Sequence, residues 1–143
     1  AALPSERVRV RELARAVAAG LTGADPGSEP THGDFYEAQL LVADGRVSGL
    51  LDVDTAGPGC RADDLACALA HLDALTLNDP ASAASALAAQ WRAGFEQAVD
   101  PTELRLRTAG VLIALATGPH RVQRSDWQAA TTRALDNIER LLT

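Results

Sequence analysis

The dipeptide Asp44-Gly45 most restricts how this chain can fold, because it predicts a tight β-hairpin in a sequence whose other patterns are mainly helical. Both residues tolerate the positive φ that a type I′ turn requires, and short apolar runs over 39–42 and 46–51 flank them. The hairpin ends in Asp52-Val53-Asp54. The fold must therefore hold one small hairpin, and the acidic loop that follows it, beside a set of helices.

The segments on either side of the hairpin have helical spacing. We expect a first helix from about Ser5 to Leu21, stopped by Gly23, because its apolar residues recur on one face. Residues 22–31 are rich in Gly, Pro, Ser and Asp, which predicts a loop. A second helix is expected over 63–77.

Three further helices are expected to complete the domain. Asp79-Pro80 and Asp100-Pro101 each combine an N-cap residue with a first-turn proline, and Ser125 is expected to cap the last helix. The helix after Asp100 is apolar nearly all round, so we expect it at the centre of the bundle, with Gly118-Pro119 at its end. The inward-facing residues of the other two helices are Leu87, Trp91 and Phe95 in the first, and Ala130, Ala134, Ile138 and Leu141 in the second.

Composition limits the class of protein. A chain of 143 residues fits one domain, and 47% apolar with 22% charged residues is ordinary for a soluble, cytoplasmic protein. No apolar run approaches the roughly 20 residues of a membrane span. The net charge of -6, with scattered cations, argues against a nucleic-acid groove. Every cation is Arg and none is Lys, which together with the many Ala residues indicates a GC-rich bacterial gene.

The cysteines and histidines raise the possibility of a metal site. Cys67 and His71 are four residues apart and would share a helix face, with Cys60 nearby in the sequence. A structural zinc site needs four ligands, and His32 and His120 lie far off in sequence. We therefore favour buried, reduced thiols over a zinc site.

The segment from Thr31 to Ala66 carries residues suited to phosphoryl transfer. That reaction needs a carboxylate to orient the acceptor hydroxyl and take its proton, and hard oxygen ligands to hold Mg²⁺ against the phosphates. Asp34 ends a loop, Gln39 lies five residues later, and Asp52 closes the hairpin. Because the hairpin folds back on itself, Asp52 can come near Asp34.

These elements resemble the catalytic core of the aminoglycoside phosphotransferase and choline kinase-like family, whose members are relatives of protein kinases. The resemblance covers about a quarter of the chain and implies the helical C-terminal lobe of a protein kinase-like fold: mainly α, with one small hairpin. It implies Asp34 as catalytic base, Asp52 as magnesium ligand, and ATP or GTP as phosphoryl donor. Asp64, in Asp-Leu-Ala, and His32 would brace the catalytic loop.

Gln39 departs from the family pattern, which usually has Asn as a metal ligand at this place. Gln keeps the amide oxygen on an arm longer by one methylene, so the metal geometry could loosen without being lost. Asp54 is open to two interpretations: a contact to a second metal or to substrate, or a solvated loop carboxylate. Without its partners in register, His32-Gly33-Asp34 would be only a polar turn.

A rival interpretation starts from the segment 50–55, whose apolar-Asp-x-Asp-x-Thr pattern resembles phosphatases of the haloacid dehalogenase type, with Asp52 as nucleophile. Those enzymes need a parallel α/β sheet and further acidic residues after later strands. Beyond Asp54 only helices are predicted, so this interpretation is disfavoured.

The resemblance also implies parts that the chain does not contain. A kinase of this kind has a Gly-rich loop and a strand Lys in an N-terminal nucleotide lobe, and neither is present. We therefore expect residues 1–143 to be the catalytic lobe of a longer phosphotransferase, inactive alone and able to dimerise through the apolar surface that faced the missing lobe. The acceptor would be the hydroxyl of an aminoglycoside- or choline-like molecule, with carboxylates such as Asp73, Glu96 or Glu103 available to its ammonium groups. The alternative is a kinase-like module that binds a partner without catalysis.

Overall fold

The chain is mainly α, as the sequence predicted. The computed structural model describes residues 4–79 and 81–143. Its helices are α1 (Arg7–Gly20), α2 (Arg61–Asn78), α3 (Ala84–Phe95), α4 (Pro101–Leu115), α5 (Gly118–Arg121) and α6 (Trp127–Leu142), and its strands are β1 (Glu29–Thr31), β2 (Leu40–Ala43), β3 (Arg46–Leu50) and β4 (Gly57–Gly59). Short 3₁₀ turns are η1 (Pro4–Glu6), η2 (Glu37–Gln39) and η3 (Val53–Thr55). None of the helices within the described residues is long and apolar enough to cross a membrane.

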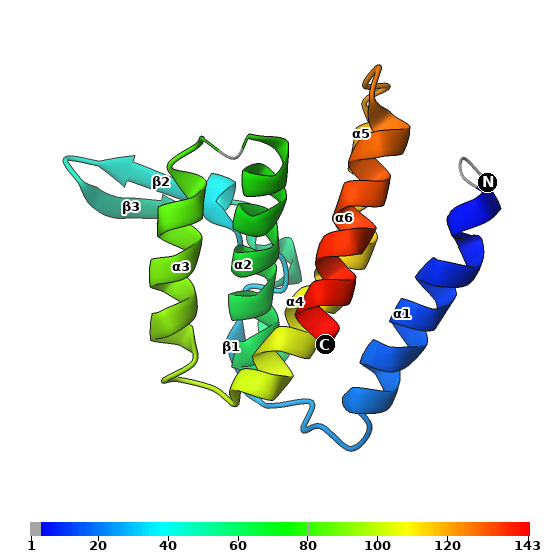
Figure 1. Ribbon diagram of the computed structural model, residues 1–143. Helices are drawn as coiled ribbons and strands as arrows, with labels where there is room; N and C mark the ends of the chain where they lie inside the picture. The colour runs from blue at the N-terminus through cyan, green and yellow to red at the C-terminus, as the bar shows by residue number, and fades with distance from the viewer. Residues whose placement is uncertain (1–3, 80) are drawn as a thin grey trace.

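Helix α4 lies at the centre of the bundle, as its uniformly apolar sequence predicted. It packs against α1, α2 and α6, while α3 packs on α2 at the side of the molecule that carries the hairpin (Figure 1). The main core joins α1, α2, α4 and α6. Its buried residues come from these helices and from the C-cap of α4: Leu13, Val17, Ala70, Ala109, Leu112, Ala116, Leu135 and Ile138. A smaller cluster of Ala66, Leu69 and Leu104 is covered by Trp91 and Phe95 of α3. Helix α2 belongs to both clusters, so the residues at its N-terminus are held on a rigid support.

The hairpin forms where the Asp-Gly dipeptide predicted it. Strands β2 and β3 are antiparallel, with Leu40 opposite Leu50 and Ala43 opposite Arg46. Asp44 has φ 51° and Gly45 has φ 72°, both in the left-handed region that a type I′ turn requires. The hairpin therefore brings its two ends, Gln39 and Leu51, back to the same place: the Leu51 N–H donates to the Gln39 carbonyl at 2.8 Å.

A second strand pair was not predicted. β1 and β4 pair antiparallel, with Glu29 opposite Gly59 and Thr31 opposite Gly57, and the Thr31 hydroxyl donates to the Gly57 carbonyl at 2.9 Å. Residues 22–31 were expected to be a loop throughout. These three-residue strands contain Pro and Gly, which are depleted in strands, so the local sequence does not predict them. They form because the two segments, far apart in the sequence, pair with each other in the folded chain. Within the described residues both sheets are antiparallel pairs, so the parallel sheet of a dehalogenase-type phosphatase does not form there.

Two predicted helix starts are wrong. α3 begins at Ala84 rather than at Asp79-Pro80, and Asp79 instead follows the end of α2, where its carboxylate accepts from the Ala81 N–H at 3.2 Å. Pro80 lies outside the described residues. α6 begins at Trp127, preceded by Asp126 rather than capped by Ser125. Asp126 makes no capping bond because its carboxylate is bound by arginine side chains instead.

One predicted helix end needs correction, whereas one predicted cap is confirmed. α1 ends at Gly20, within one residue of the predicted Leu21 and before Gly23, but α4 ends at Leu115, so that Gly118-Pro119 begins α5 instead of ending α4. The proline explains this, because its fixed φ and missing N–H suit the first turn of a helix. At the start of α4, Asp100 accepts from the Glu103 N–H at 2.8 Å, as the sequence predicted.

Candidate active site

The loop that carries Asp34 is held in place through hydrogen bonds to its backbone N–H groups. Asp64, in the first turn of α2, accepts two hydrogen bonds from this loop: from the His32 N–H at 2.6 Å and from the Gly33 N–H at 2.9 Å. A carboxylate that accepts two N–H groups holds both the position and the orientation of a peptide segment. α2 is anchored in the core, so the loop takes its place relative to the helical bundle from Asp64.

His32 ties the same loop to the end of the hairpin. Its ring is buried, with Nε2 at 2.8 Å from the Leu51 carbonyl and Nδ1 at 3.3 Å from the Asp34 N–H. Both contacts are satisfied if Nε2 carries the proton and Nδ1 accepts, which is the neutral form of the ring. Because Leu51 directly precedes Asp52, this one side chain links the Asp34 loop to the loop that carries Asp52.

Gly33 is required by geometry at the centre of this loop. Its φ is +89°, and a Cβ placed there would lie 2.9 Å from both the carbonyl oxygen and the hydroxyl of Thr55. The Thr55 hydroxyl is itself occupied, since it donates to the His32 carbonyl at 2.8 Å. The contact between this loop and η3 is therefore too close for any residue larger than glycine.

Gln39 and Asp52 are brought together by the hairpin. Gln39 is the buried last residue of η2, directly before β2, and its Nε2 lies 3.4 Å from Oδ2 of the exposed Asp52, just past the end of β3. Asp52 has φ 53° and ψ 49°, a left-handed conformation that is uncommon for a residue other than glycine and is favoured at functional positions. The sequence had predicted that these two side chains, with Asp34, would converge.

The donor set of Gln39 and Asp52 fits Mg²⁺ in kind. Carboxylate and amide oxygens are the hard ligands that Mg²⁺ takes, and it commonly keeps several waters and phosphate oxygens beside one or two protein ligands. An amide binds a metal only through its oxygen, so Gln39 would have to present Oε1 where its nitrogen now faces Asp52. The exposed Asp54 lies in η3, next to this pair in sequence.

The side chain of Asp34 has neighbours that sequence reasoning did not place beside it. The Cys67 thiol donates to Asp34 Oδ1 at 3.6 Å, and the ring of His71 stacks on Tyr36 with centroids 4.0 Å apart. Burial, together with the charge of Asp34, raises the pKa of Cys67 to about 12. Burial lowers the pKa of His71 below its usual value, against the opposing charges of Glu37 and Asp34. The four-residue spacing of Cys67 and His71 was visible in the sequence, but the contact with Asp34 depends on how α2 packs.

A cavity of about 290 Å³ opens beside His71. It is walled by α2, α4, α5 and η2, and its polar lining residues are Glu37, His71, Asn78 and Arg124, of which Arg124 is engaged with Asn78 and Asp126. Oε2 of Glu37 is buried and has no hydrogen-bond partner within the described part of the chain. A buried carboxylate oxygen without a donor is costly, so it marks a place where a donor from a ligand would be stabilising.

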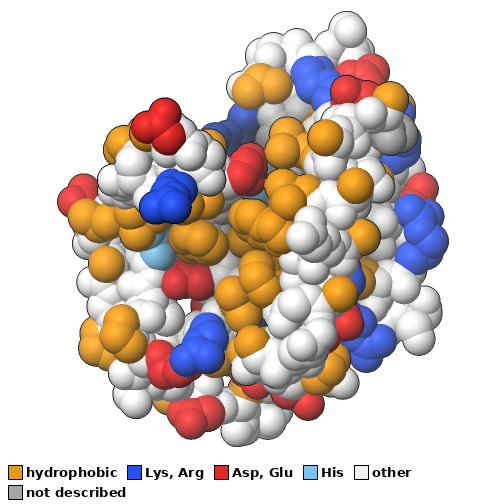
Figure 2. Space-filling model, turned by 90° about the vertical axis from the view of Figure 1, so that its left-hand side faces the viewer, with side chains coloured by type: hydrophobic (Ala, Val, Ile, Leu, Met, Phe, Trp, Pro, Cys, Tyr) orange, Lys and Arg blue, Asp and Glu red, His pale blue; other side chains and the backbone are white. Residues whose placement is uncertain are grey.

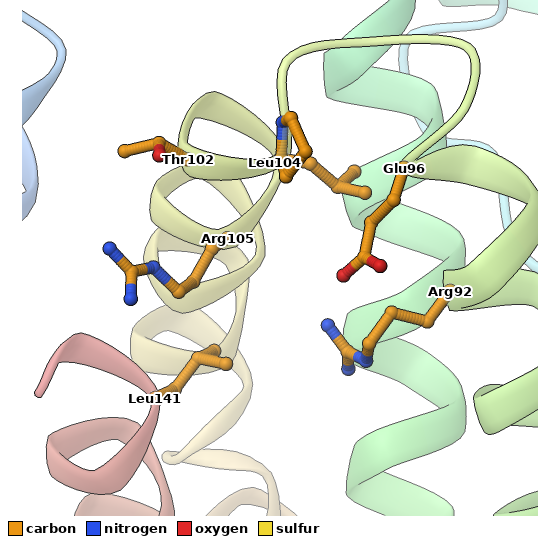
Figure 3. A pocket seen from close by; sticks show the side chains of 7 residues that line it. Arg92, Glu96, Thr102, Leu104, Arg105 and Leu141 are labelled. Atoms are coloured by element: carbon orange, nitrogen blue, oxygen red, sulfur yellow. The ribbon is translucent and has the colours of Figure 1, made fainter.

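A larger hollow of about 340 Å³ lies elsewhere, between α3, α4 and α6 (Figure 3). Arg92 and Glu96 line one side of it and Arg105 the other, and no residue of the Asp34 loop reaches it. The carboxylates that the sequence suggested for an acceptor are engaged or remote. Asp73 pairs with Arg92, Glu103 pairs with Arg107, and Glu96 faces this hollow.

Comparison with known proteins identifies the family. Residues 2–108 match the model of a family described as the phosphotransferase enzyme family. Neither the comparison with curated proteins nor the comparison with solved structures gave a match. The matched range contains the Asp34 loop, the hairpin and the N-terminal part of α2, which are the segments in which the sequence resembles aminoglycoside phosphotransferases. With well over half of its residues covered by that one match, the chain belongs to the phosphotransferase enzyme family.

Proposed function

We propose that this chain is the catalytic lobe of an ATP-dependent small-molecule kinase, in which Asp34 is the base that acts on the acceptor hydroxyl. The observation that carries the proposal is the double hold on the Asp34 loop, by Asp64 on α2 and by His32 at the end of the hairpin. This hold fixes the backbone and leaves the carboxylate of Asp34 exposed. A positioned, solvent-accessible carboxylate, with metal-ligand side chains on the segment to which its loop is tied, is what phosphoryl transfer needs from a protein.

In the proposed reaction, Asp34 accepts a hydrogen bond from the acceptor hydroxyl and takes its proton as the hydroxyl oxygen attacks the γ-phosphorus of ATP. The bond between the γ-phosphorus and the bridging oxygen breaks, and ADP leaves with that oxygen. Asp52 and Gln39 would hold Mg²⁺, which supplies charge neutralisation to the phosphate oxygens when bound. His32 and Asp64 are positioning residues that keep Asp34 in place.

For the acceptor, the cavity beside His71 is the most suitable place. It adjoins the Asp34 neighbourhood through His71, and it is lined by Glu37, whose buried Oε2 has no hydrogen-bond partner among residues 4–79 and 81–143. A cationic group of the acceptor would pair with Glu37, as an ammonium group does with a carboxylate in a partly dry site. An amino alcohol, aminoglycoside- or choline-like, meets both requirements: a hydroxyl for Asp34 and an ammonium group for Glu37.

The nucleotide is expected to need a further lobe. Large apolar side chains of the hairpin and of the segment that follows it are exposed: Leu41, Val42, Val47, Leu50, Leu51 and Val53. On the hairpin side of the molecule, hydrophobic side chains gather over a broad part of the surface (Figure 2). Apolar surface of this kind indicates a contact with another domain or another chain. It supports an N-terminal lobe packed there, and it equally suits the second candidate function, a kinase-like module that docks a partner.

The two functions are separated by two isosteric variants of the whole gene product. Asp34→Asn keeps the shape of the loop but removes the base, and we expect phosphate transfer from ATP to a panel of amino alcohols to fall by about two to four orders of magnitude. Asp44→Asn, in the exposed hairpin turn, is the matched control and should keep full activity. If the parent protein transfers phosphate and Asp34→Asn transfers it equally well, the assignment of the base is wrong. If the parent transfers none, with any acceptor, the binding module becomes the better description.

A further inference from the structure

We propose that Asp34, Cys67 and His71 form a binding site for a zinc-class transition-metal cation, which occupies the catalytic base and switches the site off. The three residues come from two elements that the fold brings together: the loop after β1 carries Asp34, and α2 carries the other two. One ligand atom from each, a carboxylate oxygen, the Cys67 sulfur and a ring nitrogen of His71, lie within 4.8 Å of one another. The binding step stands on this geometry alone, and the inhibitory consequence rests on the proposed function.

The spacing is close to what a tetrahedral cation needs. Zinc–ligand bonds of about 2.0 to 2.3 Å place two ligand atoms of a tetrahedral site roughly 3.3 to 3.8 Å apart. The present separations, at most 4.8 Å, therefore need to shrink by no more than about 1.5 Å, which side-chain rotation can supply. Cys67 and His71 are four residues apart on α2 and so already share one helix face.

The donor set selects the kind of metal. Sulfur and imidazole ligands favour zinc and its neighbours over magnesium, which prefers oxygen. Three protein ligands leave a fourth position for water or for an acceptor hydroxyl, the pattern of an open rather than a structural zinc site. The sequence argument against zinc required four protein ligands, a condition that does not apply to an open site.

The surroundings are suited to a cation. The Cys67 thiol donates to Asp34 Oδ1, so its proton lies where the metal would bind, and one Zn²⁺ displaces that one proton to solvent. Glu37 adds negative charge near His71, and no donor to its buried Oε2 is found in the described part of the chain. The stack on Tyr36 limits rotation of the His71 ring, which lowers the entropy lost on binding.

The consequence for the reaction is direct. An Asp34 oxygen bound to a metal cannot accept the proton of an acceptor hydroxyl, so the cation would compete with the acceptor and not with magnesium at Gln39 and Asp52. Thiol oxidation or alkylation of Cys67 would abolish the metal effect by removing one ligand. The metal would thus act as a reversible inhibitor at a position that the phosphotransfer reaction itself does not use for a metal.

The test is a titration of the metal-free protein with Co²⁺, whose bond to a thiolate gives a charge-transfer absorption band. We expect one equivalent of Co²⁺ to bind with this band, and Zn²⁺ to displace it. Cys67→Ser should remove the band, and His71→Gln should weaken binding at least tenfold. The matched controls are Cys60→Ser and His120→Gln. In the parent protein the Cys60 sulfur lies against Glu103, and the His120 ring packs on Trp127.

Each result of the titration has one meaning. Absence of the band in the parent protein, or a band that survives Cys67→Ser, overturns the site. Far-UV circular dichroism shows whether each variant is folded, and displacement of Co²⁺ by Zn²⁺ in the parent protein supplies a second measurement that needs no variant. The activity arm is separate: Zn²⁺ should inhibit the active gene product at least tenfold more strongly than its Cys67→Ser variant. If the metal binds but Zn²⁺ inhibits the parent and the Cys67→Ser variant equally, the metal site stands and its inhibitory role in the proposed reaction is rejected.

Discussion

Replacing Asp64 with alanine should release the loop that carries Asp34. The carboxylate of Asp64 is the acceptor for two backbone N–H groups of that loop, those of His32 and Gly33. Alanine removes both bonds at once without leaving a charge in the helix. Because both hydrogen bonds are made to the backbone of the loop, the variant changes how the loop is held and does not alter its sequence.

The expected cost follows from the two bonds. Hydrogen bonds to a charged partner contribute about 1.5 to 3 kcal/mol each, and the larger values apply where water cannot replace the lost partner. The bond to Gly33 is exposed and the bond to His32 is partly buried, so the lower part of the range applies to both. We expect Asp64→Ala to lower the free energy of unfolding by about 3 to 4 kcal/mol, a substantial share of the roughly 5 to 15 kcal/mol of an ordinary domain.

Asp63→Ala is the matched control. Asp63 is the preceding residue, lies in the same first turn of α2, and has the same favourable interaction with the helix dipole. Its carboxylate is exposed and pairs with Arg107, which keeps a second partner in Glu103. A surface ion pair of this kind contributes about 1 kcal/mol or less, so any larger difference between the two variants comes from the loop.

The measurement is urea unfolding followed by far-UV circular dichroism, with amide hydrogen exchange at His32 and Gly33 as a local readout. The urea concentration at the unfolding midpoint should be about 1 to 2 M lower for Asp64→Ala than for Asp63→Ala. Exchange at the two amides should accelerate in the Asp64 variant alone. Equal midpoints with unchanged exchange would refute the argument that Asp64 holds the loop.

Three further predictions use the same logic. Gly33→Ala should lower the free energy of unfolding by at least about 1 kcal/mol more than Gly23→Ala, measured in urea, because both residues have positive φ but only Gly33 meets other atoms; equal losses would show that the loop can relax. At pH 8 Cys67 should react slowly with iodoacetamide, since a pKa of about 12 leaves roughly one thiolate in ten thousand, and rapid modification of Cys67 in a peptide map would contradict this. Asp100→Ala should cost about 1 kcal/mol in thermal unfolding through the lost cap of α4, and an unchanged midpoint would mean that water replaces the cap.

The parts of the fold that the sequence predicted correctly are those decided by near neighbours along the chain. The turn at Asp44-Gly45 depends on the φ of two residues, and the cap at Asp100 depends on one bond to a residue three positions on. The central place of α4 follows from its own uniform apolarity. In each case the physical cause lies within a few residues, so a pattern in the sequence is enough to find it.

The errors occur where a distant segment or a competing bond decides. β1 and β4 pair with each other although the whole hairpin lies between them in the sequence, so no local pattern predicts the pairing. Ser125 and Asp79 were predicted as helix caps. Asp126 instead precedes α6, with its carboxylate bound by arginine side chains, and the Asp79 carboxylate is engaged in a turn. A capping residue stabilises a helix start only if no stronger partner takes its oxygen.

The candidate site shows the same division, and it explains what the sequence missed. Gln39 and Asp52 flank one hairpin, so their approach follows from the hairpin alone, whereas the Asp34 loop is tied to the end of that hairpin by His32. Cys67 and His71 lie near Asp34 because the loop packs against α2, a contact that Asp64 makes through two N–H bonds. The contact that holds the proposed base in place is therefore also the contact that gives it a sulfur and an imidazole as neighbours. If Asp64→Ala frees the loop, it should weaken Co²⁺ binding as well as stability, while Asp63→Ala should leave metal binding unchanged.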